Sequence, residues 1–112
     1  MRHHRTSILI TDDHEVVRSG IRSYLEKISD FQVVGEASSG EETLSLVSEL
    51  IPDIVLLDLI LPGMDGIETT RRIRQISPRT KVVVLTSYHE DVHIFPALKA
   101  GAIRSEEHTS EL

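Results

Sequence analysis

Three aspartates and two hydroxyl residues stand where short apolar runs end. Asp12 and Asp13 follow the run SILIT, Asp58 closes the run IVLL, and Thr86 and Ser87 end the run KVVVLTS. Short apolar runs bounded by turn residues are typical of buried strands in a parallel sheet. The carboxyl ends of such strands share one rim, where open α/β sheets bind their ligands. If these three strands are neighbours, three carboxylates and a hydroxyl converge there.

Carboxylates gathered in this way need a compensating cation. Two like charges about 4 Å apart repel by ~4 kcal/mol at an effective dielectric of about 20. Oxygen ligands suit Mg²⁺, which leaves coordination positions open for phosphate oxygens. One carboxylate can then act as a nucleophile and become an acyl phosphate, with the Thr86 hydroxyl placed to hydrogen-bond a phosphoryl oxygen. The alternative is a solvated acidic rim without chemistry, with Asp58 as a turn or cap residue.

Helices are expected between the strands, because apolar residues recur there at helical spacing. The residues expected to face inward in the first three helices are Val17, Ile21, Leu25, Ile28, Leu44, Val47, Leu50, Ile67, Ile73 and Ile76. The basic residues of the first helix, expected to face outward, are Arg18, Arg22 and Lys27. A fourth helix is predicted over 90–100, where Pro96 favours a kink or a late start.

The order of these elements predicts the fold class. Phe31–Ala37 reads as a second strand, and Ala102–Ile103 reads as the start of a fifth, so strands and helices alternate along the chain. Alternation with helices of about three turns predicts an α/β fold, a parallel sheet with helices on both faces. At 112 residues the chain is one domain at most. Residues 1–6 are expected to be a flexible basic lead.

Composition excludes several kinds of site. There is no Cys, so disulfides, thiol catalysis and zinc–thiolate sites are ruled out. No apolar run reaches membrane-spanning length and no signal peptide opens the chain, so we expect a cytoplasmic protein without membrane contact. The net charge of −6 and the absence of Trp argue against a non-specific nucleic-acid surface or a base-stacking platform on this domain.

Four motifs agree in order and spacing with a known family. The stretches ILITDDHEVVRSGI, IVLLDLILPGMDGIE, VVVLTSYHEDV and ALKAGA together resemble the receiver domain of two-component response regulators, over residues 7–103. The resemblance implies a flavodoxin-like, doubly wound (βα)5 fold with strand order 2-1-3-4-5, here truncated after the fourth helix. The DDHEVVR opening and the LPGMDG loop are most similar to transcription regulators with a LuxR-type helix-turn-helix output domain.

The resemblance also implies a role for each residue at the rim. Asp58 would be the phosphoacceptor, and Thr86 the switch hydroxyl that turns toward the phosphoryl group. Mg²⁺ would be bound by Asp58, by Asp13 directly, by Asp12 largely through water, and by the backbone carbonyl of Ile60.

The partner implied is a sensor histidine kinase that donates the phosphoryl group. Phosphorylation would shift a two-state equilibrium and reshape the face of the fourth helix, which would govern homodimerisation or an absent DNA-binding output domain. The domain would assist its own phosphotransfer and dephosphorylation without turning over an external substrate. We therefore expect a signalling domain and not an enzyme.

After Ile103 the chain departs from the family pattern. The family continues there with a strand such as Gly-Tyr-Leu-Leu-Lys, which supplies a switch aromatic and a phosphate-binding lysine. Residues 104–112 instead read RSEEHTSEL, the translation of AGA TCG GAA GAG CAC ACG TCT GAA CTC, a common sequencing-adapter sequence. We expect these residues to be a non-native tail on an incomplete receiver domain. The strand over 81–87 is then expected to lie at an open edge of the sheet.

Two other functions fit the sequence less well. A phosphatase with an aspartyl nucleophile needs a second Asp two residues after the first, where this chain has Ile60. A flavodoxin-like cofactor binder needs a phosphate cradle after its first strand, whereas Asp12 and Asp13 would repel phosphate in the absence of a metal. A single-domain receiver without DNA output, or an interaction module that works without phosphorylation, stays open as an alternative.

Overall fold

The computed structural model describes residues 4–59, 61, 64–85 and 102–103. In chain order the elements are β1 (Thr6–Thr11), α1 (Glu15–Glu26), β2 (Phe31–Ala37), α2 (Gly40–Leu50), β3 (Ile54–Asp58), α3 (Gly66–Ile76), β4 (Lys81–Leu85) and β5 (Ala102–Ile103). Neighbouring strands pair in parallel, and the order across the sheet is β2-β1-β3-β4-β5. The predicted doubly wound α/β fold and its strand order are confirmed.

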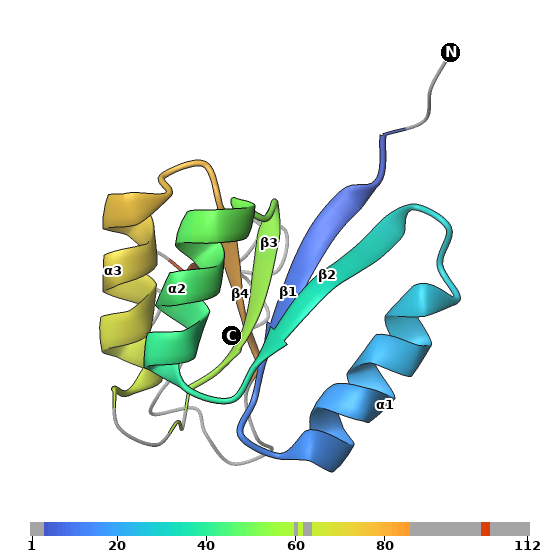
Figure 1. Cartoon of the computed structure of the whole chain (residues 1–112), viewed down its shortest axis with the longest axis horizontal. Coiled ribbons are helices and arrows are strands. Elements are labelled where there is room, and N and C mark those ends of the chain that lie inside the picture. The colour runs from blue at the N-terminus through green and yellow to red at the C-terminus, as the bar shows by residue number, and fades with distance from the viewer. Residues whose placement is uncertain (1–3, 60, 62–63, 86–101, 104–112) are drawn as a thin grey trace, which may run out of the picture.

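Helices cover both faces of the sheet, with α1 on one face and α2 and α3 on the other (Figure 1). Side chains alternate between the two faces along each strand. In β1, Ile10 packs with Leu25 of α1, whereas Leu9 belongs to the opposite core with Val47 of α2 and Ile73 of α3. Each face therefore has its own apolar core, and β1 contributes to both.

The central strand is β3, which is hydrogen-bonded between β1 and β4. Its register pairs Leu57 with Thr11 of β1, and Asp58 with Leu85 of β4. The last residue of β1 and the last residues of β3 therefore lie level with one another. This register is what brings the residues that follow β1 to the rim occupied by Asp58.

The predicted inward faces of the helices are confirmed at some positions and wrong at others. Leu25, Val47 and Ile73 are buried as predicted. By contrast, the residues predicted inward that are exposed are Val17, Leu50 and Ile76, at 42%, 38% and 44%. Each of these lies in the first or last turn of its helix.

The edge beyond β4 is partly covered. Val82 pairs with Ala102 and Val83 with Ile103, so the predicted start of a fifth strand is confirmed. The expectation of an open edge is wrong at Val82 and Val83. The helix predicted over 90–100 and the tail 104–112 lie outside the described residues. No helix among the described residues is long and apolar enough to cross a membrane.

Candidate functional site

The structure brings together the three aspartates singled out from the sequence. Ligand atoms of Asp12, Asp13, His14 and Asp58 all lie within 4.8 Å of one another. They come from two segments that are distant in sequence, the turn after β1 and the end of β3. The juxtaposition follows from the pairing of β1 with β3 and from their common register.

Asp12 lies immediately after β1 and is held there by two hydrogen bonds. Its backbone N–H donates to the carbonyl oxygen of Ala37 at 3.0 Å, which extends the pairing of β1 with β2 by one residue. Its carboxylate accepts a hydrogen bond from the backbone N–H of His14 at 2.8 Å, which turns the chain into α1. Asp12 is only 5% exposed, so its carboxylate lies on the buried side of the carboxylate cluster.

Asp13 lies beside Asp12 and is more open to solvent, with a side chain 35% exposed. The ring Nδ1 of His14 lies 2.9 Å from a carboxylate oxygen of Asp12 and 3.1 Å from one of Asp13. The hydrogen bond with Asp12, and then the charge of Asp13, raise the pKa of His14 above 6.5. The acidic rim thus favours a positive charge on the exposed side chain next to it.

Asp58 is the last residue of β3, and Leu59, the residue after it, packs tightly against Gly66 at the start of α3. The backbone N–H of Gly66 donates to the carbonyl oxygen of Leu59 at 3.0 Å. A Cβ at Gly66 would lie 2.6 Å from the Cα of Leu59, closer than packed side chains allow, so only glycine fits there. Asp65 caps α3 by accepting from the backbone N–H of Glu68 at 2.8 Å. The end of the PGMDG motif therefore anchors α3 beside Asp58.

Two further residues predicted for the site, the carbonyl of Ile60 and the hydroxyl of Thr86, lie outside the described residues, as does Ser87.

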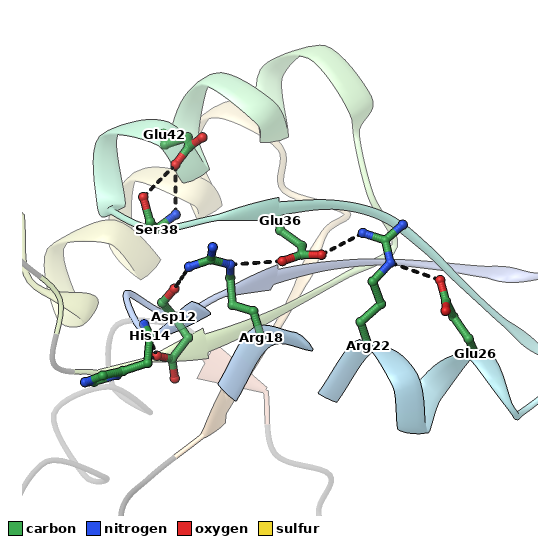
Figure 2. A network of polar contacts seen from close by, with 8 residues as sticks. All are labelled: Asp12, His14, Arg18, Arg22, Glu26, Glu36, Ser38 and Glu42. Atoms are coloured by element: carbon green, nitrogen blue, oxygen red, sulfur yellow. Dashed lines mark hydrogen bonds and ion pairs between the residues drawn. The ribbon is translucent and has the colours of Figure 1, made fainter. Parts of the chain in front are cut away.

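Two side chains at the site were not identified from the sequence. One is His14, whose ring nitrogen lies within the carboxylate cluster as a possible metal ligand. The other is Arg18, which was predicted to face outward but has a side chain only 16% exposed. Its Nη1 donates to the carbonyl oxygen of Asp12 at 2.6 Å, and its Nε donates to Glu36 at 3.0 Å (Figure 2). His14 and Arg18 are one helical turn apart, so the sequence places both near the start of α1. The contact between Arg18 and Glu36 depends on the position of β2, which the sequence does not show.

The donor set fits a hard divalent cation. Three carboxylates within a few ångströms supply the oxygen ligands that such ions prefer, and the single imidazole is already engaged by two of them. Asp12 lies deep while Asp13 is partly exposed, so an ion and a small ligand can approach from solvent.

Comparison with known proteins agrees with this geometry. Residues 8–105 match the response regulator receiver domain family. The chain belongs to this family. A receiver domain is a signalling domain that interacts with histidine kinases, and a phosphoacceptor role follows from membership.

This receiver domain is similar to regulators of the LuxR type. It is 46% identical over 96 residues to the transcriptional regulatory protein LiaR of Bacillus subtilis, covering 86% of this chain and 46% of LiaR. It is 49% identical over 94 residues to the response regulator protein VraR of Staphylococcus aureus, covering 84% of this chain and 45% of VraR. It superposes on a LuxR-family two-component response regulator from Aurantimonas sp. SI85-9A1 with a TM-score of 0.82 and 39% identity, covering 88% and 70%. The chain thus spans about half the length of the curated relatives it matches.

Proposed function

We propose that this receiver domain accepts a phosphoryl group from a sensor histidine kinase on Asp58, with Mg²⁺ as the cofactor. The observation that carries the proposal is the convergence of Asp12, Asp13 and Asp58 within 4.8 Å at the end of the central strand. Asp13 and Asp58 would bind the ion directly and Asp12 largely through water, with the carbonyl of Ile60 as a further ligand.

The chemistry assigns a separate task to each carboxylate. An Asp58 oxygen attacks the phosphorus atom, while the bond from phosphorus to the imidazole nitrogen of the kinase breaks. Asp12 and Asp13 supply the negative charge that favours cation binding here. Bound Mg²⁺ would neutralise the negative charge of the incoming phosphoryl oxygens. The Thr86 hydroxyl donates to one of those oxygens. Water later attacks the phosphorus atom, the bond to the Asp58 oxygen breaks, and inorganic phosphate leaves the free carboxylate; we propose that the domain assists this dephosphorylation of itself.

We further propose that the domain is the receiver part of a cytoplasmic transcription regulator. The support is its coverage of 46% of a relative named a transcriptional regulatory protein. Phosphorylation would then control homodimerisation and a DNA-binding output domain encoded beyond Ile103. Reading the frame past Ile103 in the source genome tests this, because a single-domain receiver would end soon after its fifth helix.

The phosphoacceptor assignment is tested with acetyl phosphate and Mg²⁺, using the mass of the chain as the measurement. The parent chain is expected to gain one phosphoryl group, and Asp58→Asn none. Asp53→Asn is the matched control, because Asp53 lies just before β3 at the opposite end of the strand; it is expected to behave like the parent. Each is measured in the 112-residue chain and in a version whose residues 104–112 are replaced by a receiver-family fifth strand and helix. An acyl phosphate on Asp58→Asn would overturn the assignment.

A further inference from the structure

Asp12 joins the sheet to the carboxylate cluster, and both of its backbone polar groups are hydrogen-bonded. The N–H of Asp12 donates to the Ala37 carbonyl at 3.0 Å, and the carbonyl oxygen of Asp12 accepts from Nη1 of Arg18 at 2.6 Å. A peptide unit is planar, so fixing the Asp12 carbonyl also fixes the amide and the Cα of Asp13. The position of the Asp13 Cα, from which the carboxylate extends into the cluster, is thereby restrained.

Arg18 can do this because its own side chain is fixed. Its Nε donates to Oε1 of Glu36 at 3.0 Å, while Nη1 points to Asp12. The guanidinium is planar with donors at fixed angles, so two acceptors, one on β2 and one just after β1, determine its orientation. The Arg18 and Glu36 side chains are 16% and 25% exposed, which makes this pair better shielded than an ordinary surface ion pair.

Glu36 is in turn held by a second arginine. Its Oε2 accepts from Nη1 of Arg22 at 2.6 Å, and Nε of Arg22 donates to Glu26 at 2.9 Å. Figure 2 shows the resulting line of contacts, which runs from Asp12 through Arg18, Glu36 and Arg22 to Glu26. Two arginines alternate with two glutamates along this line, so their charges cancel. Arg18 is therefore poorly suited to act as a counter-ion for the rim carboxylates, and its contribution is geometric.

We infer that Arg18 is a positioning residue for the cation site, orienting the Asp12–Asp13 peptide so that Asp13 is aimed before the ion binds. Glu36 is the residue that orients Arg18. This inference rests on the proposed function, because it assumes that the cluster binds Mg²⁺. Residues that orient metal ligands typically contribute about 10–100-fold to metal affinity.

Mg²⁺ titration of the 112-residue chain by calorimetry tests this inference. Arg18→Met removes both hydrogen bonds and is expected to weaken Mg²⁺ binding by about tenfold. Arg18→Lys keeps the charge but cannot satisfy two acceptors in one plane, so it is expected to recover little of the loss. Arg71→Met is the matched control, since Arg71 also bonds a glutamate at 2.6 Å but lies on α3; it is expected to bind Mg²⁺ like the parent.

A second measurement is made without metal. NMR relaxation of the Asp13 backbone amide should show an order parameter that falls from about 0.85 toward about 0.6 in Arg18→Met and stays high in Arg71→Met. Urea unfolding of each variant, also without Mg²⁺, separates this local effect from a general loss of stability.

Each outcome either supports or overturns the role inferred for Arg18. A folded Arg18→Met that binds Mg²⁺ like the parent overturns the inference, and full recovery in Arg18→Lys shows that charge, not geometry, is what counts. If Arg18→Met does not fold, Glu36→Gln decides: several-fold weaker Mg²⁺ binding supports the inference, and unchanged binding overturns it. A parent chain that binds no Mg²⁺ overturns the proposed function and this inference together, whereas Mg²⁺ binding that is insensitive to Arg18 and Glu36 overturns the inference alone.

Discussion

At the amino end of the parallel strands one aspartate is held by donors from the chain, whereas at the carboxyl end three aspartates lie together. Oδ2 of Asp53 accepts from the backbone N–H of Ser7 at 2.8 Å and from its hydroxyl at 3.1 Å. The N–H of Asp53 returns a bond to the Ser7 hydroxyl oxygen at 2.8 Å, so β1 and the start of β3 are clamped together. At the other end, Asp12 and Asp13 lie with Asp58 and share the exposed ring of His14.

The two ends of the sheet differ in what compensates the negative charge. The backbone hydrogen bond from Ser7, followed by its hydroxyl, lowers the pKa of Asp53, so the chain itself stabilises this negative charge. At the rim the carboxylates face one another, and the cost of their repulsion is relieved when a cation binds. The same residue type, at two ends of one sheet, therefore stabilises the fold at one end and, under the proposed function, would bind a cation at the other.

The largest effect is expected from Asp13→Asn, which replaces a proposed carboxylate ligand with a neutral amide and so removes one of the like charges. Mg²⁺ binding should weaken by more than about tenfold, because even residues that only support metal ligands contribute about 10–100-fold. Without metal, the free energy of unfolding should hold or rise by up to about 1 kcal/mol as repulsion is relieved. Calorimetric titration and urea unfolding measure the two quantities. Mg²⁺ binding equal to that of the parent would place the ion elsewhere.

Asp53→Ala should show the opposite pattern. Loss of the hydrogen bonds to Ser7 is expected to lower the free energy of unfolding by about 1 kcal/mol, a value reduced because the Asp53 side chain is 46% exposed. Mg²⁺ affinity should not change. Ser7→Ala is the control: it removes the two hydrogen bonds of the hydroxyl but keeps the bond from the Ser7 N–H to the charged carboxylate, so its effect should be smaller. A loss of Mg²⁺ binding in Asp53→Ala would break the division between the two ends.

The pH dependence of stability should follow from the lowered pKa of Asp53. A carboxyl group with a depressed folded pKa contributes stability above its ordinary value of 3.8, and the contribution is lost as pH falls through the folded pKa. The difference in free energy of unfolding between the parent and Asp53→Ala should therefore shrink below pH 3.8. Urea unfolding at a series of pH values measures it. A difference that grows on acidification would show that the carboxylate is not the stabilised form.

The smallest effect concerns Ile51, which ends α2 with a φ of 46°. This left-handed conformation is unfavourable for a β-branched residue and suits glycine. Because the side chain is 55% exposed, Ile51→Gly loses little packing and should raise the free energy of unfolding by up to about 1 kcal/mol. Leu50→Gly is the control and should destabilise, because residue 50 is still helical. Mg²⁺ affinity should stay at the parent value, as expected for a change near the amino end of the parallel strands, opposite the carboxylate cluster.

Local features of the sequence sufficed for the elements and for the kinds of residue at the rim. Phe31–Ala37 was predicted with the bounds that β2 has, because side-chain alternation and flanking turn residues are short-range signals. The placement of Asp58 at the end of a buried strand followed in the same way from the run before it. These features depend only on neighbouring residues, so a single sequence carries them.

Tertiary structure determined which side chains distant in sequence lie together. Whether Asp12 and Asp13 would reach Asp58 depended on β1 and β3 being neighbours, which spacing alone left conditional and the strand order settled. Helical periodicity placed Arg18 on an outward face, yet β2 passes close enough for Glu36 to bind it. Contacts of this kind join residues far apart in the chain, and they arise from the packing of α1 against the sheet, which no local pattern encodes.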